Sequence, residues 1–108
     1  MGRYDVAIDD ADCSCVTVSI KGRFDYRLFQ SFDEIFSRAF SWDNKVTIDL
    51  SDTEYLDSCA LGLLLLLRDN VDKMTTIFLE NPVPDVKRVL TTANFDKLFV
   101  IEDQLESA

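Results

Sequence analysis

The stretch that most constrains the fold is residues 46–67, VTIDLSDTEYLDSCALGLLLLL. Its first five residues are mostly apolar and largely β-branched, which predicts a buried strand over residues 46–50. A polar loop over residues 51–54 follows, and Tyr55 and Leu56 return the chain to the core. Asp57 is placed to cap a helix that begins at Ser58. The stretch therefore predicts a strand, a loop and a capped helix in direct succession.

The helix after Ser58 is unusually apolar. Every residue from 61 to 67 except Gly62 is leucine. Seven residues make about two turns, so leucines lie on every side, and we expect the helix to be buried nearly all round. The run falls far short of the roughly 20 apolar residues that a membrane span needs. The polar first turn, Asp57-Ser58-Cys59, is then the part of the helix that should meet solvent or a partner.

The rest of the chain predicts an α/β fold with a mixed sheet. Alternating apolar residues predict strands at 3–9 and 13–20, joined as an antiparallel hairpin, with Gly22 expected to end the second strand. Later elements should connect by parallel crossovers. They are a helix at 25–40, a strand at 75–79, a helix from Pro84 to about residue 93 and a short strand at 98–101. We expect one domain over residues 1–108, with a frayed tail at 103–108.

The net charge of the chain limits the kinds of partner that it can bind. Eleven Lys and Arg against 20 Asp and Glu give a net charge of −9. Such a chain repels nucleic-acid phosphates, so we predict no direct nucleic-acid binding. The acidity favours either simple solubility or association with a basic protein surface. The first residues do not resemble a signal peptide, and three cysteines indicate reduced thiols, so we expect a cytoplasmic protein without membrane insertion.

Catalytic and metal-binding patterns are weak. The sequence contains no histidine and only three glycines, so it lacks a Ser-His pair and a phosphate-binding glycine loop. Asp49, Asp52, Glu54 and Asp57 could hold Mg²⁺, although such carboxylates more often form a solvated rim. Cys13 and Cys15 should share one face of a strand as structural cysteines rather than metal ligands. We therefore predict no enzyme activity, no metal and no cofactor.

Ser58 has a specific electrostatic environment. A serine that begins a helix lies among unsatisfied backbone N–H groups at the positive end of the helix dipole. A phosphoryl group there would be stabilised locally and would add nearly two negative charges to the surface. The alternative is an ordinary first-turn serine with no modification.

Several motifs resemble the STAS domains of anti-sigma factor antagonists. Residues 48–67, IDLSDTEYLDSCALGLLLLL, are similar to the family signature, in which a strand ending in D-L-S leads to a D-S-S/T-G-L-G stretch and a leucine-rich helix. Residues 20–25, IKGRFD, resemble the family's element after its second strand. Residues 79–90 and 94–99 resemble the later strand, helix and closing element. The resemblance thus covers nearly the whole chain.

The resemblance implies a regulatory switch. In that family the serine after the aspartate is phosphorylated by an anti-sigma factor that is also a kinase, or by a separate kinase, and a phosphatase reverses the mark. The unphosphorylated form binds the anti-sigma factor and so frees a sigma factor. By position, Ser58 matches the phosphoacceptor. The partner surface would consist of Asp25, Asp57, Ser58, Cys59, Ala60 and Leu61.

Two residues depart from the family pattern. Cys59 stands where a hydroxyl residue is usual, and Ala60 stands in place of glycine. They support a second hypothesis, a STAS subunit that serves a transporter or signalling complex without phosphorylation at Ser58. A third hypothesis, a phospho-aspartate receiver with Asp49 as acceptor, fails because the chain opens with a hairpin and has no lysine after the last strand.

Overall fold

The computed structural model describes residues 4–103. Their elements follow one another in this order: β1 (Tyr4–Asp9), β2 (Cys15–Phe24), the 3-10 turn η1 (Tyr26–Leu28), α1 (Phe29–Ala39), β3 (Lys45–Asp49), β4 (Thr53–Leu56), α2 (Ser58–Asn70), β5 (Thr76–Glu80), α3 (Pro84–Thr92), the 3-10 turn η2 (Phe95–Lys97) and β6 (Val100–Glu102). The predicted order of strands and helices is confirmed, with β4 as the addition.

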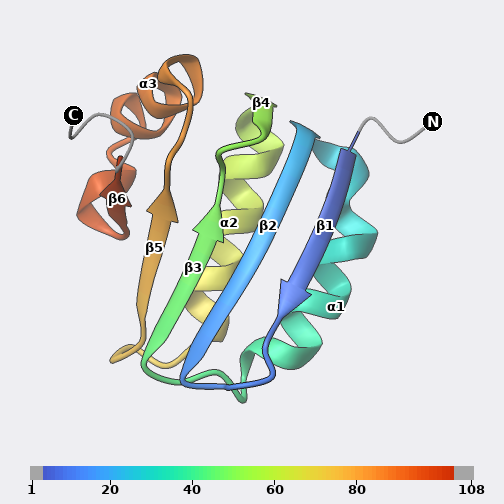
Figure 1. Cartoon of the computed structure of the whole chain (residues 1–108). Helices are drawn as coiled ribbons and strands as arrows, with labels where there is room; N and C mark the ends of the chain where they lie inside the picture. The colour runs from blue at the N-terminus through green and yellow to red at the C-terminus, as the bar shows by residue number, and fades with distance from the viewer. Residues whose placement is uncertain (1–3, 104–108) are drawn as a thin grey trace.

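The strands form one six-stranded mixed sheet in the order β1-β2-β3-β5-β6, with β4 paired to β2. The β1–β2 pair is antiparallel and the other pairs are parallel. Figure 1 shows α1 and α2 packed against one face of the sheet, while no helix of the described chain covers the other face. The expected α/β class and the opening antiparallel hairpin are therefore both confirmed.

The core lies between the sheet and these two helices. Side chains alternate along β2, so that Val16, Val18 and Ile20 are buried and their neighbours are not. Period-two alternation of this kind is what a strand with one covered face requires. The helices contribute apolar side chains from their inner faces, among them Phe32 and Leu64. Trp42 is also buried, and its indole N–H donates to Asp10 at 3.1 Å.

Gly22 does not end β2, contrary to the expectation from sequence. The strand continues to Phe24, and the β2–β4 register shifts between Gly22 and Arg23. Gly22 has φ of 82°, a left-handed conformation that glycine adopts without the penalty that other residues incur. The glycine therefore lies opposite an irregularity of the β2–β4 pairing, in which Glu54 of β4 is skipped between Thr53 and Tyr55, and not at a break in β2. The strand beyond it pairs with β4, which occupies part of the stretch expected to be loop.

The leucine helix is not buried all round, and that prediction is wrong. Leu63, Leu64 and Leu67 point into the core, but Leu65 is 40% exposed and Leu66 is 50% exposed. Because α2 packs on one face of the sheet, a 3.6-residue repeat covers only one side of it. Leucine composition alone could not distinguish one covered side from complete burial.

The predicted cysteine placement is also wrong. Cys13 lies in the turn before β2, whereas Cys15 begins the strand, so the two do not share a strand face. All three cysteines are free and exposed. The expected tail at 103–108 lies outside the described residues except for Asp103, whose carboxylate is 3.8 Å from Lys87 Nζ.

Candidate functional site

The first turn of α2 is capped as predicted. Asp57 has extended backbone angles, and its Oδ1 accepts the backbone N–H of Ala60 at 3.1 Å. The carbonyl of Asp57 accepts the N–H of Leu61 at 3.1 Å, which is the first hydrogen bond of the helix. Ser58 and Cys59 follow the cap directly, and both are exposed. The hydroxyl of Ser58 is thus accessible at the N-terminus of a well-formed helix.

A second capped helix begins next to it. Phe24 of β2 pairs with Leu56 of β4. The residues that follow them, Asp25 and Asp57, therefore leave the sheet at the same end of these two parallel strands. The carboxylate of Asp25 accepts the backbone N–H of Arg27 at 3.0 Å and caps η1, which leads into α1. The strand pairing therefore places Asp25 in the same region as Asp57 and the start of α2.

The two aspartates differ in their surroundings. Asp25 is only 4% exposed. Arg27 donates from Nε to Oδ1 at 3.1 Å and from Nη2 to Oδ2 at 2.8 Å, and Arg23 Nε lies 3.5 Å from Oδ2. The Arg27 side-chain hydrogen bond, aided by the Arg27 backbone N–H, the Arg27 charge and the side-chain interaction with Arg23, lowers the pKa of Asp25 to about 2 against an opposing effect of burial. Asp25 is therefore ionised and held in place at neutral pH.

Arg23 joins this cluster to β4. Its guanidinium carbon lies 4.0 Å from the centre of the Tyr55 ring, a cation–π distance. Tyr55 is the register partner of Arg23 across the β2–β4 pair. Sequence reasoning missed both arginines, although their spacing around Asp25 was a usable signal. An Arg-x-Asp-x-Arg pattern places two cations beside one carboxylate.

Two of the residues expected at the partner surface are buried. Asp25 is enclosed by its arginines, and Ala60 has no exposed area, so the methyl group of Ala60 faces the core. Leu61 is partly buried against the core, while Asp57 is half-buried. Among the residues expected at the partner surface, Ser58 and Cys59 therefore have side chains that another protein could contact directly, and Asp57 and Leu61 are accessible only in part.

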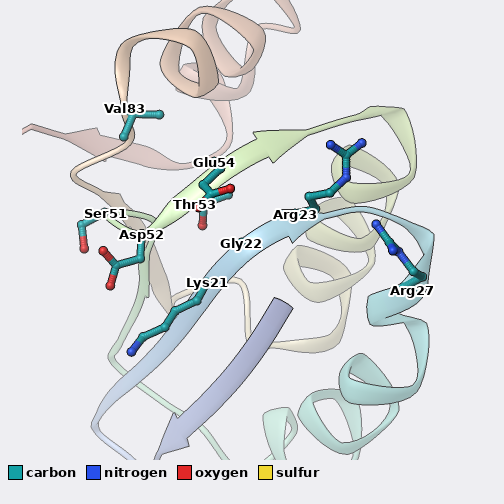
Figure 2. Close-up of a pocket in the computed structure, with 9 residues that line it drawn as sticks. All are labelled: Lys21, Gly22, Arg23, Arg27, Ser51, Asp52, Thr53, Glu54 and Val83. Carbon is teal, nitrogen blue, oxygen red and sulfur yellow. The ribbon is translucent and has the colours of Figure 1, made fainter. Parts of the chain in front are cut away.

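A cleft of about 760 Å³ lies beside this region (Figure 2). Its lining includes none of the predicted partner residues; it consists of Lys21, Gly22, Arg23, Arg27, Ser51, Asp52, Thr53, Glu54 and Val83. Figure 2 shows Lys21 and Asp52 at one end and the two arginines at the other. Because Asp25 neutralises part of the arginine charge and Asp52 and Glu54 add negative charge, the cleft has no evident excess of positive charge for an anion.

The carboxylates near β3 do not converge. Asp49 Oδ1 accepts the N–H of Ser51 at 3.0 Å. Within residues 4–103, no group of three Asp, Glu, Cys or His side chains is placed to hold a metal ion. Asp49, Glu80 and Glu102 instead lie in register across β3, β5 and β6. Burial, with repulsion from Glu102 and Asp49, raises the pKa of Glu80 above its usual value, and Lys45 opposes this effect.

Comparison with known proteins identifies the fold family. The sequence model of the STAS domain matches residues 7–108. The chain belongs to the STAS domain family. It is 40% identical over 96 residues to a STAS-domain containing protein of Pseudomonas aeruginosa, covering 88% of this chain and 95% of that protein.

Solved STAS structures have the same architecture. An anti-sigma factor antagonist from Mycobacterium paratuberculosis superimposes with a TM-score of 0.79 at 22% identity, covering 95% of this chain and 88% of that one. The anti-sigma factor antagonist SpoIIAA in its unphosphorylated form gives 0.77 at 17% identity, covering 95% and 92%. The phosphorylated form of Bacillus SpoIIAA gives 0.68 at 15% identity, covering 95% and 96%. The chain therefore has the fold of anti-sigma factor antagonists.

No helix within residues 4–103 is both long enough and apolar enough to cross a membrane. The leucine-rich α2 has 13 residues in all, and a span of the hydrocarbon core needs about 20.

Proposed function

We propose that this STAS domain is a cytoplasmic anti-sigma factor antagonist controlled by phosphorylation of Ser58. Its unphosphorylated form binds an anti-sigma factor and thereby frees a sigma factor. The observation that carries the proposal is the exposed Ser58 directly after the Asp57 cap, at the N-terminus of α2. SpoIIAA, which has a similar fold, has been solved in a phosphorylated form, and this supports the same chemistry here.

The proposed switch is a group transfer carried out by partners. Ser58 Oγ attacks the γ-phosphorus of ATP held by a serine kinase, ADP leaves, and the hydroxyl proton is released. A serine phosphatase returns the hydroxyl by hydrolysis. The STAS domain is the substrate in both steps and supplies no catalyst, in keeping with a sequence that contains no histidine.

The exposure of Ser58 is consistent both with phosphorylation by a kinase and with the effect of the added phosphate on partner binding. A kinase can reach the hydroxyl without unfolding the helix. The added phosphate then lies beside Asp57 within the proposed partner surface, where an uncompensated charge is costly to bury. Asp25 contributes indirectly, because its hydrogen bonds position the start of α1 beside this surface.

The alternative, a STAS subunit of a larger complex with an unmodified Ser58, rests on the departures at Cys59 and Ala60. Ala60 is fully buried, so its methyl group does not alter the surface that a kinase would meet. Cys59 is exposed and is the one change at that surface. The Cys59→Ser variant should bind and be phosphorylated within a few-fold of wild type; oxidant-sensitive binding lost in this variant would favour a redox role instead.

Two measurements test the proposal. Mass spectrometry of protein purified from cells should detect phosphoserine at Ser58. Titration calorimetry against the purified cognate anti-sigma factor should give tight binding for Ser58→Ala and at least tenfold weaker binding for Ser58→Asp. Equal affinities for the two variants, both of which should remain folded, would exclude the switch.

A further inference from the structure

The outer side of α2 presents an apolar surface whose two most exposed side chains, Leu65 and Leu66, lie outside the core. It consists of Leu61, Gly62, Leu65 and Leu66, which we call the outer face of α2. Leu65 is 40% exposed and Leu66 is 50% exposed, while Leu61 is partly buried. Residues three and four apart on a helix are neighbours, so Gly62 lies beside both exposed leucines. The outer face therefore forms one continuous surface directly below Ser58.

Gly62 gives this surface an unusual shape. A Cβ atom built at Gly62 would meet no neighbouring atom within 4 Å. The glycine is thus not required by packing inside the domain, although glycine within a helix lowers helix stability relative to other residues. What it provides is access, because the backbone of α2 can be approached closely between two projecting leucines. A second helix packs well against a surface of this shape.

Acidic residues lie at both ends of the outer face. Asp57 precedes it and Asp69 follows it, 12 positions apart in the sequence, which corresponds to about 18 Å along a helix. Neither carboxylate makes an ion pair with another described residue, and Asp69 is exposed. The neighbouring Arg68 donates from Nη2 to the carbonyl of Asp72 at 2.8 Å. A partner with basic groups at matching ends would complement this charge.

We propose that the outer face of α2 binds an amphipathic helix of the anti-sigma factor, with an apolar stripe flanked at both ends by Lys or Arg. The inference rests on the proposed function and extends it from the first turn of α2 to the next two turns. The apolar stripe packs on Leu65 and Leu66 and crosses close to Gly62. The basic ends pair with Asp57 and Asp69, and the net charge of −9 accelerates the encounter.

Substitution at Gly62 tests the contact without disturbing the core. The Gly62→Gln side chain enters open space, and glutamine favours helix over glycine, so the melting temperature should stay the same or rise. Affinity for the purified anti-sigma factor, measured by calorimetry, should fall at least tenfold. The double variant Leu65→Ser, Leu66→Ser should weaken binding by a similar or larger factor. Leu98→Ser is the matched control, because Leu98 is 49% exposed outside α2.

The contribution of the Asp69 charge, at the C-terminal end of the outer face, can be measured separately. Asp69→Asn should slow association in stopped-flow measurements and make the rate less sensitive to salt. The exposed Asp96 in η2 is the matched control, and Asp96→Asn should change neither quantity beyond its effect on net charge. Equal salt dependence for the two variants would exclude pairing at Asp69.

A photo-crosslinking amino acid at position 66 tests the nature of the occupant. Crosslinked positions on the anti-sigma factor should recur every three or four residues, as on one side of a helix. Crosslinks at every second residue would indicate an extended strand and overturn the helical occupant. If Gly62→Gln and the leucine variant bind normally while Ser58→Asp still weakens binding, this inference fails and the proposed function stands. If wild-type protein does not bind the anti-sigma factor, both fail.

Discussion

This STAS domain has two neighbouring strand-to-helix junctions, after β2 and after β4, that share one local structure but differ in how exposed they are. In each, a strand ends at a buried apolar residue, Phe24 or Leu56, and an aspartate then caps a helical segment. Asp25 is buried and clamped by Arg27 and Arg23. Asp57 is half-buried and makes one cap hydrogen bond, to Ala60.

The comparison separates a fixed junction from an accessible one. Around Asp25, the cap, the two arginines and the Tyr55 ring form a connected cluster. After Asp57, the next two side chains are exposed and carry a hydroxyl and a thiol. Hydrogen bonds and ion pairs hold the start of α1, whereas the first side chains of the neighbouring α2 are open to solvent.

The largest expected effect follows removal of the clamped carboxylate. Asp25→Ala should lower the free energy of unfolding by about 1–3 kcal/mol, because it removes a cap and leaves two arginines without their carboxylate. The value is below that for a fully buried pair, since the Arg23 and Arg27 side chains are 47% and 36% exposed. Urea denaturation provides the measurement. A loss no greater than that of Asp57→Ala would remove the distinction between the junctions.

The pH dependence of stability should also separate the two junctions. The pKa of Asp25 is lowered from 3.8 to about 2 in the folded state. The folded protein therefore binds this proton less tightly than the unfolded chain, so the stabilisation is present above pH 3.8 and is lost as pH falls towards 2. Asp25→Asn should flatten the stability profile in this range.

The pKa of Glu80 is shifted in the opposite direction, so Glu80 must be replaced before the pH dependence of stability can be assigned to Asp25. Its pKa is raised above 4.5 in the folded state, so its contribution to stability increases as pH falls through the raised pKa and is lost as pH rises. The stability of Glu80→Gln should therefore exceed that of Glu80→Gln, Asp25→Asn by a constant amount above pH 3.8, and the difference should shrink as pH falls towards 2. Asp12, whose pKa is lowered by hydrogen bonds from Ser14, is present in both proteins and cancels. Parallel acid limbs would contradict the assignment to Asp25.

Loss of the second cap should have a smaller effect. Asp57→Ala removes the acceptor of the Ala60 N–H, and loss of such a cap typically costs about 1 kcal/mol. Asp57→Asn retains an acceptor and should be nearly neutral in urea denaturation. If Asp57→Asn is as damaging as Asp57→Ala, the charge of Asp57 rather than its cap hydrogen bond stabilises α2.

Much of this arrangement could be predicted from the sequence, for identifiable reasons. The Asp57 cap followed by an apolar run indicated the start of α2 correctly, because capping is a local interaction. The sequence predicts a loop over part of β4, because the four residues of this strand do not alternate regularly between buried and exposed positions. β4 forms because it pairs with the C-terminal part of β2. The sequence around β4 does not indicate this pairing.

Side-chain environment was less predictable than backbone structure. The partial exposure of Leu65 and Leu66 depends on which side of α2 meets the sheet. The burial of Ala60 depends on the same orientation. The arginine clamp on Asp25 was visible as a pattern, but its hydrogen bonds required the turn of η1 to bring the charges together.

The smallest expected effect on the fold is that of phosphorylation at Ser58. The helix dipole and free N–H groups favour an anion there by about 0.3–1 kcal/mol. Repulsion from Asp57, the residue directly before Ser58, is of similar size and is screened by salt. Leu63, Leu64 and Leu67 are buried, and each contributes roughly 1.5–3 kcal/mol of burial to the folded state. These leucines should hold α2 whatever the charge on its first turn.

Phosphorylated and unphosphorylated protein should therefore share one backbone structure, and the accessible junction should change its surface charge alone. Amide chemical shifts should change around residues 56–62 and the adjoining loops, with a melting temperature altered by only a few degrees. A matched comparison with Ser58→Ala separates the loss of the hydroxyl from the gain of the phosphate. Large shift changes through residues 63–68, or a lost cooperative transition, would show that phosphate melts α2 and that this junction switches by unfolding.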